Sequence, residues 1–431
     1  MMQALPVPAA ASSCAHAAPR LQPARLAMPA LAALLAFAVL SPTLLEAMGH
    51  AGAGEGNVLR QAAYVVFLLL AWAAASASGV RATQALPTSL LVAFGWCALS
   101  LAWAYDPGTG VRRLLLTAMV AWTLFLLVAS AGYGRTVTAV RWLLALLLAA
   151  NFMAVLVWPT ASIHQAALEA DPSIVGAWHG VLAQKNFAGA VCALTVVFFT
   201  LDAGRVPALL RMVVVVGAAV FLYFSASKTS AGMLVAALGL GLGHRLYDPY
   251  FRIPLFAALA LLLVLLGVVG YEHRDLVEDL LLDPRAFTGR AQIWNALAAF
   301  AAEHPLGGAG FGSFWNVTGV QPIARHAQGW VAEITSGHNG YLDLLVQLGW
   351  PGLVLAVWAL VLAPLARLLK QPRLDPRRAS LVVACVVFGG LHNLSESSLL
   401  DRDAAVYVFM LLAIALLHSG AVDAVQAESA P

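Results

Sequence analysis

Charged residues are scarce in this chain. They make up only 10% of its 431 residues, whereas soluble domains carry roughly 25%. Apolar residues make up 61% and gather in long runs from end to end. Each run is long enough to cross a bilayer core of roughly 30 Å as a helix. This balance excludes an ordinary soluble domain and predicts an all-α polytopic membrane protein, with membrane lipids and no nucleic acid around it.

Residue patterns for disulfides, metals and nucleotides are also lacking. Three of the four cysteines lie inside apolar runs, and none has metal-ligand spacing. No His/Asp cluster has the spacing of a metal site. The glycines at 307–312 are not followed by Lys-Ser/Thr, so they form no phosphate-binding P-loop, and no Gly-x-Ser-x-Gly elbow occurs. We therefore expect no metal and no cofactor.

About twelve transmembrane helices are predicted from the apolar runs. Nine fall in residues 26–271 and three in 340–420. Residues 1–25, rich in Ala and Pro, predict a disordered cytoplasmic N-terminus, and 421–431 a cytoplasmic tail. The predicted spans are 26–46, 61–80, 86–104, 114–132, 138–158, 180–201, 208–226, 229–243, 253–271, 340–366, 379–397 and 403–420.

The distribution of basic residues sets the predicted orientation. With the N-terminus inside, most of them fall in inside loops, as the positive-inside rule requires. These are Arg20, Arg25, Arg81, Arg135, Arg141, Arg205, Arg211, Arg245, Arg252, Arg367, Lys370, Arg373, Arg377 and Arg378. Both termini are then cytoplasmic, and residues 272–339 form one long external loop. A loop of this length inside a compact domain is usually functional. Within it, residues 291–302 predict an amphipathic helix that could lie at the membrane interface.

Basic residues on the external side need a reason, because the same rule disfavours them. Arg290 opens the amphipathic helix, Lys185 begins the sixth span, and Lys228 lies between spans seven and eight. A cation at a helix N-terminus opposes the helix dipole, so Arg290 is expected to have an anionic partner. Together the three could form a pocket for a diphosphate. The alternative is that such cations reach lipid headgroups, which we favour for Arg60, Arg112 and Arg113 and leave open for Lys228.

A histidine opens the tenth predicted span. His338-Asn339 is followed by nine residues and then by Gly349-x-x-Gly352, after which the chain is wholly apolar. An imidazole at the mouth of a membrane helix can meet both water and a lipid-borne substrate. A general base is the functional interpretation, and an interfacial polar residue is the alternative.

These motifs resemble the O-antigen ligase family, within the larger group of O-antigen polymerases and O-linked oligosaccharyltransferases. His338-Asn339 with Gly349 and Gly352 matches its signature, and Thr288-Gly289-Arg290 with Ile293-Trp294 and the segment from His304 to Gly312 is similar to a second element. Gln184-Lys185-Asn186 and Leu99–Trp103 resemble two further elements. The resemblance covers roughly residues 60–400. Such proteins often carry arginine near the seventh span where this chain has Lys228, which keeps the charge but not the bidentate grip.

The resemblance implies a metal-independent, inverting glycosyltransferase of the bacterial inner membrane, with its active site in a periplasmic loop at 272–339. It would move O-antigen from undecaprenyl diphosphate to a sugar hydroxyl of lipid A–core. His338 would take the hydroxyl proton, and Arg290 would stabilise the departing diphosphate. Lys185, Asn186, Lys228 and Asn339 would bind the donor.

Two alternatives remain at this point. An O-antigen polymerase or an O-linked protein oligosaccharyltransferase would use the same donor and another acceptor. A transporter belongs to a different class, but transporters place charges at mid-membrane and contain repeats, and neither feature is visible here.

Overall fold

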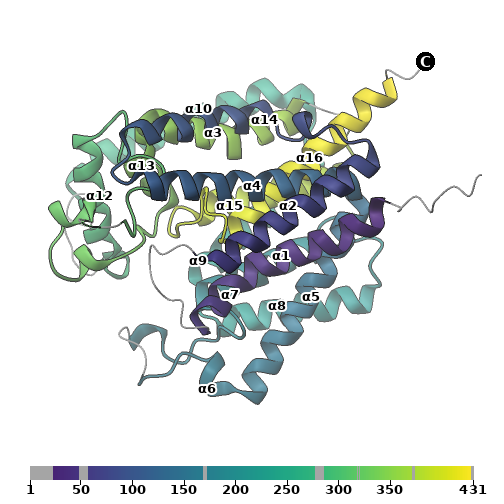
Figure 1. Cartoon of the computed structure of the whole chain (residues 1–431), viewed down its shortest axis with the longest axis horizontal. Coiled ribbons are helices and arrows are strands. Elements are labelled where there is room, and N and C mark those ends of the chain that lie inside the picture. Colours follow the sequence, from purple (N-terminus) through teal and green to yellow (C-terminus); the bar gives the residue numbers. More distant parts are fainter. Residues whose placement is uncertain are drawn as a thin grey trace, which may run out of the picture.

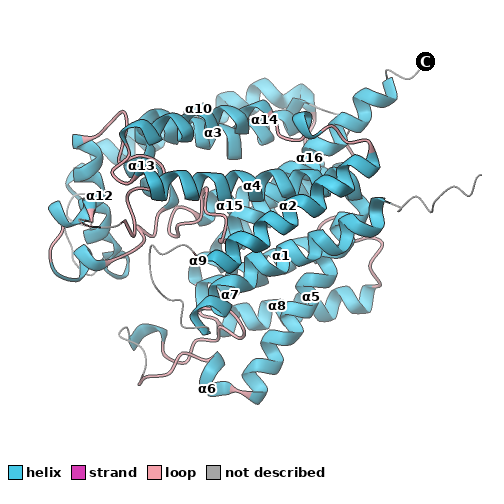
Figure 2. Cartoon of the chain, in the orientation of Figure 1, coloured by secondary structure: helices cyan, strands magenta, loops and turns pink. Residues whose placement is uncertain are grey.

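Each predicted span coincides with a helix in the computed structural model (Figures 1 and 2). The structure describes residues 23–47, 57–167, 172–276, 286–317, 319, 321–370 and 374–428. Most of the predicted disordered segment 1–25 lies outside these ranges. The long helices are α1 (Pro23–Ala47), α2 (Val58–Ser78), α3 (Thr88–Ser100), α4 (Pro107–Ala131), α5 (Tyr133–Val157), α7 (Lys185–Thr200), α8 (Ala208–Phe224), α9 (Lys228–Gly243), α10 (Arg252–Glu272), α13 (Gly340–Val357), α15 (Pro376–His392) and α16 (Ala405–Glu428).

Shorter helices complete the fold. A π-helical turn, Trp358–Leu362, joins α13 to α14 (Ala363–Lys370), so residues 340–370 form one continuous helical segment. The other short α-helices are α6 (Pro159–Ser162) and α12 (Arg290–Glu303). Within the described ranges no strand occurs, and the β-type pairing there is an isolated bridge between Ile163 and Trp178. The predicted all-α class is therefore confirmed.

Six described helices are long and apolar enough to cross a membrane: α1, α2, α4, α5, α10 with the turn before it, and the segment 340–370. Apolar helices of 10–17 residues occur at α3, α7, α8 and α16. The count of twelve crossings stays a prediction. Helix α10 is strongly apolar yet buries none of its described residues, and Ile253 is 75% exposed. Such a surface is suited to lipid, and together with the other long apolar helices it supports a multi-pass membrane protein.

Helix α15 lies at the centre of the bundle, against α7, α9 and α16. It is buried almost throughout because small residues such as Ala384, Gly389 and Gly390 let its neighbours approach closely. Helices α7 and α15 are buried along most of their length and pack against each other. Their ends therefore mark two opposite faces of the protein, and the candidate site lies at one of them.

The segment between α10 and α13 has a hydrophobic core of its own. Its helix α12 confirms the helix predicted at 291–302 and buries Ile293, Leu297 and Phe300. These side chains pack with Phe314 and with residues of α13 rather than facing outward. Figure 1 shows α12 beside the start of α13 at one end of the bundle. The apolar face of α12 thus anchors this segment to the transmembrane helices.

Orientation in the membrane can be tested with single cysteines in a cysteine-free background. Ala324 lies exposed between α12 and α13, and Ala208 lies exposed at the start of α8. We expect Ala324→Cys to react with an impermeant thiol reagent added to cells that have a permeable outer membrane. Ala208→Cys should react only after the inner membrane is broken. The opposite pattern would show that residues 272–339 face the cytoplasm.

Candidate functional site

One buried carboxylate gathers the side chains of the site. Glu396 lies in the loop between α15 and α16, and its side chain is only 10% exposed. Its Oε1 accepts hydrogen bonds from Nδ2 of Asn186 at 2.7 Å and from Nη2 of Arg290 at 2.8 Å. Its Oε2 lies 3.7 Å from Nδ1 of His338. Three residues predicted from separate parts of the sequence therefore meet at Glu396.

The surrounding charges keep Glu396 ionised. Burial by itself raises the pKa of this carboxyl group, but the nearby imidazole of His338 and the positive charge of Arg290 outweigh it, so the pKa lies below its ordinary value of 4.5. Glu396 is therefore a carboxylate throughout the neutral range. It offers a fixed negative charge to Arg290 and to the imidazole of His338.

Arg290 is the first residue of α12, and the predicted anionic partner is present. That partner is Glu396, and Nη1 of Arg290 also donates to the carbonyl oxygen of Ser395 at 2.5 Å. Two of the five guanidinium N–H groups are used in these bonds, and the side chain is 18% exposed. Arg290 is thus held in place with donors left for a further anion.

His338 occupies a strained backbone position. Its φ is +47°, in the left-handed region that residues other than glycine rarely adopt, at a cost of about 1–3 kcal/mol. The neighbouring turn is locked by Asp343, whose Oδ1 accepts from the backbone N–H of Gly337 at 3.1 Å and from the indole N–H of Trp315 at 3.0 Å. The His338 side chain is 38% exposed. The imidazole is therefore fixed on its Glu396 side and open on the other.

Asn339 caps a helix, a role that the sequence analysis did not assign to it. Its side-chain oxygen accepts from the backbone N–H groups of Tyr341 and Leu342, both at 3.1 Å, at the start of α13. Its Nδ2 donates to the carbonyl oxygen of Leu394 and its backbone N–H to the hydroxyl of Ser397. Asn339 thus ties the His338 turn to the Glu396 loop, and its predicted contact with the donor stays a prediction.

Both predicted lysines open helices that begin near Glu396. Lys185 is the first residue of α7, directly before Asn186. Lys228 is exposed as the first residue of α9, and the next residue, Thr229, lies 3.0 Å from the Ser395 hydroxyl through its own hydroxyl. Four helices, α7, α9, α12 and α13, therefore begin around the Glu396 loop. The N-cap residues of α7, α9 and α12 make no side-chain cap bond, and the first N–H of α7 donates to Nε2 of His164 at 3.3 Å. The positive ends of the helix dipoles favour a bound anion.

Glycines fix the segment from His304 to Gly312 against α13. The helix is kinked at Gly349, where φ is +65°, and Trp350 N–H donates to the carbonyl oxygen of Pro305 at 2.8 Å. A Cβ on Gly349 would lie 2.4 Å from the Leu306 backbone, and one on Gly352 would meet Trp96. The Gly-x-x-Gly part of the signature is thus a packing device that sets how the loop meets the helix.

Gly340, the first residue of α13, packs closely against the loop that follows α15, and this contact can be tested. A Cβ there would lie 2.2 Å from Oδ1 of Asn393, and the Gly340 N–H donates to the carbonyl oxygens of Asn393 and Glu396. We expect Gly340→Ala to destabilise the protein by about 1–3 kcal/mol, the usual cost of overpacking. Thermal unfolding in detergent measures the loss. Gly239→Ala in α9, where nothing lies within 4 Å of an added Cβ, is the control and should leave the midpoint nearly unchanged. Equal midpoints for the two variants would contradict the tight contact.

Glu396 is the residue that the sequence analysis missed. It fell inside the predicted span 379–397, whereas α15 ends at His392 and residues 393–404 form a loop. An ionisable residue inside a predicted span was the available signal, since such residues are costly in lipid and usually functional. Within the described ranges no group of three or more metal-ligating side chains occurs.

Comparison with known proteins finds a family similarity over part of the chain. A search of curated proteins finds no match to the chain. The family model described as O-antigen ligase matches residues 188–357. The match spans Lys228, Arg290, His338 and Asn339, while Lys185 and Asn186 lie just before it and Glu396 lies beyond it. Residues 188–357 are therefore similar to the O-antigen ligase family.

Proposed function

We propose that this protein is a lipopolysaccharide O-antigen ligase. It transfers a glycan from undecaprenyl diphosphate to a sugar hydroxyl of lipid A–core, at the periplasmic face of the bacterial inner membrane. The observation that carries the proposal is the convergence of Arg290, Asn186 and His338 on Glu396. Arg290 offers a positive charge to a leaving anion, and the exposed imidazole of His338 lies beside it as a base.

The diphosphate is the part of the donor that the site fits best. Arg290 keeps guanidinium donors beyond those that bind Glu396 and Ser395. Lys185 and Lys228 are the first residues of α7 and α9, two of the helices that begin around the Glu396 loop. Positive charge placed where negative charge develops is among the strongest contributions to catalysis. The donor carries its own good leaving group, so no acid is needed to protonate it.

His338 acts as the base in this scheme. A proton on Nδ1, the nitrogen that faces Glu396, leaves the lone pair on Nε2 for the acceptor hydroxyl. As the hydroxyl oxygen bonds to the anomeric carbon, its proton passes to Nε2. The bond from the anomeric carbon to the phosphate oxygen breaks, and the diphosphate leaves with the electron pair. A single displacement of this kind inverts the anomeric carbon, and Glu396 stabilises the imidazolium that forms.

Two other activities fit the same donor site. A polymerase would use the end of a growing glycan as acceptor, and a protein oligosaccharyltransferase would use a Ser or Thr hydroxyl. The family similarity covers both the ligase and the polymerase reaction. A transporter needs no base, so the His338–Glu396 pair favours transfer over transport.

Deletion of the gene separates these activities. Loss of a ligase should leave lipid A–core without its O-chain ladder while polymerised glycan accumulates on the lipid carrier. Loss of a polymerase should leave cores that carry a single repeat unit. Loss of a protein glycosyltransferase should leave the lipopolysaccharide unchanged. Either of the last two patterns would overturn the ligase assignment.

Glu396→Gln tests the positioning of the base. The amide keeps the size of the side chain but removes the charge that holds Arg290 and His338. We expect a fall of about 10²-fold in the transfer rate, the scale of a displaced reacting group. Transfer with purified protein in detergent measures the loss.

A matched control comes from α12. Glu303→Gln changes a carboxylate that is 61% exposed and outside the site, and it should leave the transfer rate unchanged. If Glu396→Gln keeps the wild-type rate, Glu396 does not position the base.

A further inference from the structure

A second basic site lies at the opposite face of the bundle. A cavity of about 500 Å³ opens between the start of α5, the end of α7, the start of α8 and the start of α15. Helices α7 and α15 contribute their other ends, Asn186 and the Glu396 loop, to the candidate active site. The cavity is therefore separated from that site by the length of these helices, about 24 Å for a helix of the size of α7. In the predicted orientation it faces the cytoplasmic leaflet.

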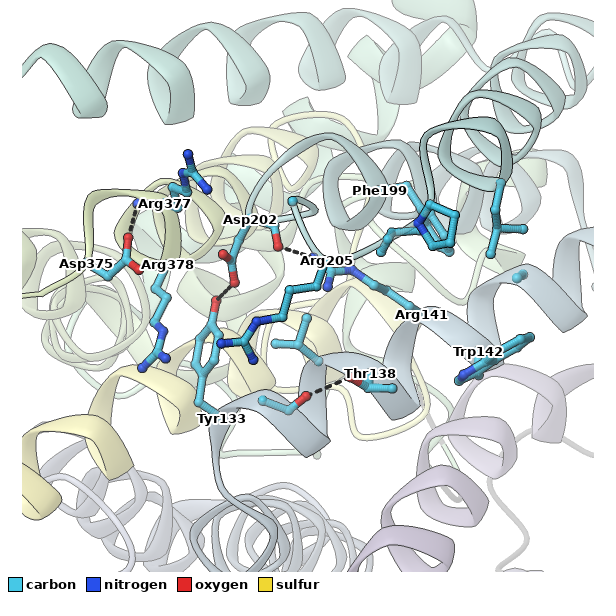
Figure 3. A pocket seen from close by; sticks show the side chains of 17 residues that line it. Tyr133, Thr138, Arg141, Trp142, Phe199, Asp202, Arg205, Asp375, Arg377 and Arg378 are labelled. Carbon is cyan, nitrogen blue, oxygen red and sulfur yellow. Dashed lines mark hydrogen bonds between the residues drawn. The ribbon is translucent and has the colours of Figure 1, made fainter.

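The charge of this cavity is positive. Four arginines and two aspartates line it, which leaves a net charge of +2. Both aspartates serve local structure, since Asp202 accepts from the Tyr133 hydroxyl at 2.8 Å and Asp375 caps α15 through the backbone N–H of Arg377. The arginines are Arg141, Arg205, Arg377 and Arg378. Figure 3 shows them around Tyr133 and Asp202.

Three of these arginines have guanidinium groups available for a ligand. Arg141 is committed to the fold, because it donates to the carbonyl oxygens of Phe198, Leu201 and Asp202 at the end of α7. Arg378 lies over the Tyr133 ring, 4.6 Å from its centre, which fixes the direction of its head group. Among the described residues, no carboxylate lies within ion-pair distance of Arg205, Arg377 or Arg378.

Apolar side chains form the rest of the wall. Trp142, Ala145, Phe199, Val206 and Leu210 also line the cavity. Trp142 is 61% exposed on α5, which is apolar and long enough to span a membrane. Tryptophan is enriched at the level of lipid headgroups. Cations at the helix ends, followed inward by aromatic and aliphatic side chains, match a molecule with an anionic head and a hydrocarbon tail.

We propose that this cavity binds the phosphate headgroup of an anionic phospholipid of the cytoplasmic leaflet. Arg205, Arg377 and Arg378 hold the phosphate oxygens, and the apolar wall takes the first part of an acyl chain. Basic pockets between membrane helices on this side are suited to acidic lipid headgroups. A free phosphate shares the headgroup chemistry but makes no use of the apolar wall. The site is independent of the transfer reaction assigned to the opposite face.

Lipid binding can be measured by native mass spectrometry on the purified full chain. The protein is delipidated in detergent and titrated with phosphatidylglycerol or with phosphatidylcholine of the same acyl chains. We expect one phosphatidylglycerol to bind more tightly than any phosphatidylcholine. Arg205→Ala with Arg378→Ala should weaken that binding by roughly fivefold per arginine, the effect of one basic side chain near an anionic lipid surface.

Controls separate the lipid from its alternatives. Arg135→Ala removes an exposed arginine from the first turns of α5 that does not line the cavity, and it should leave binding unchanged. Inorganic phosphate at millimolar concentration should not displace the lipid. Equal binding of the two lipids, equal loss in Arg135→Ala, or displacement by free phosphate would each overturn the proposal. Thermal unfolding of the double variant without added lipid should match the wild type, which shows that the loss is one of binding and not of folding.

Discussion

The His338→Ala variant should lose about 10²–10⁴-fold of the transfer rate, the usual contribution of a general base. Removal of the imidazole leaves the acceptor hydroxyl without a proton acceptor, whereas Arg290 and Asn186 keep their bonds to Glu396. Binding of the lipid-linked donor should therefore change little, and the loss should fall on kcat. Transfer with purified protein, donor and lipid A–core in detergent measures both quantities.

The pH profile of the wild type should report on Glu396. The pKa of this carboxyl group lies below the ordinary 4.5 of a glutamate. Its ionised form is therefore present above that range and is lost only as the pH falls below it. Because the carboxylate holds Arg290 and His338, the part of the transfer rate that depends on Glu396 should fall only below that range, and this fall should be absent from Glu396→Gln.

Two controls distinguish a base from an interfacial polar residue. His338→Asn keeps a polar side chain that tolerates the left-handed backbone at this position, and it should be as slow as His338→Ala. His273→Ala removes an exposed histidine at the end of α10 and should be fully active. A purified His338→Asn protein that transfers glycan at a rate comparable with the wild type would reduce His338 to an interfacial group.

Long apolar runs predict helices well because the information is local. Each run from 26–46 to 403–420 forms a helix with boundaries shifted by a few residues. The segment 340–370 is less regular than its composition suggests, with a kink at Gly349 and a π-helical turn at Trp358–Leu362. The kink depends on distant residues, since Gly349 packs against the Pro305–Leu306 backbone. Such contacts leave no periodic signal in the sequence.

The candidate site shows the same limit. Arg290 and His338 could be found because each is out of place locally, a cation at a helix N-terminus and an imidazole at a membrane helix. Glu396, on which they converge, could not be found in this way. It is separated in sequence from Asn186 by 210 residues and from Arg290 by 106 residues. Asn339 illustrates a local ambiguity, because an asparagine before a helix caps its N-terminus as readily as it binds a ligand. Only the structure shows that its side chain is used for the cap.

Arg290→Ala should cost about 10²–10³-fold in transfer rate, the scale of losing one donor to a developing negative charge. The guanidinium lies at the start of α12 with donors free beyond Glu396 and Ser395. Arg290→Lys should also be slow, because a fork of donors is replaced by a single point charge. Arg325→Ala, which removes an exposed arginine of the same loop, should retain the wild-type rate.

A complication at Arg290 is that its removal leaves the buried Glu396 carboxylate with less charge compensation, which is itself destabilising. The variant with both Arg290→Gln and Glu396→Gln removes the two charges together and should recover much of the thermal stability lost in Arg290→Ala. If Arg290 binds the departing diphosphate, the double variant should remain as slow as the single one despite that recovery. Return of the transfer rate together with stability would show that Arg290 serves only as the partner of Glu396, and the diphosphate site would then rest on Lys185 and Lys228.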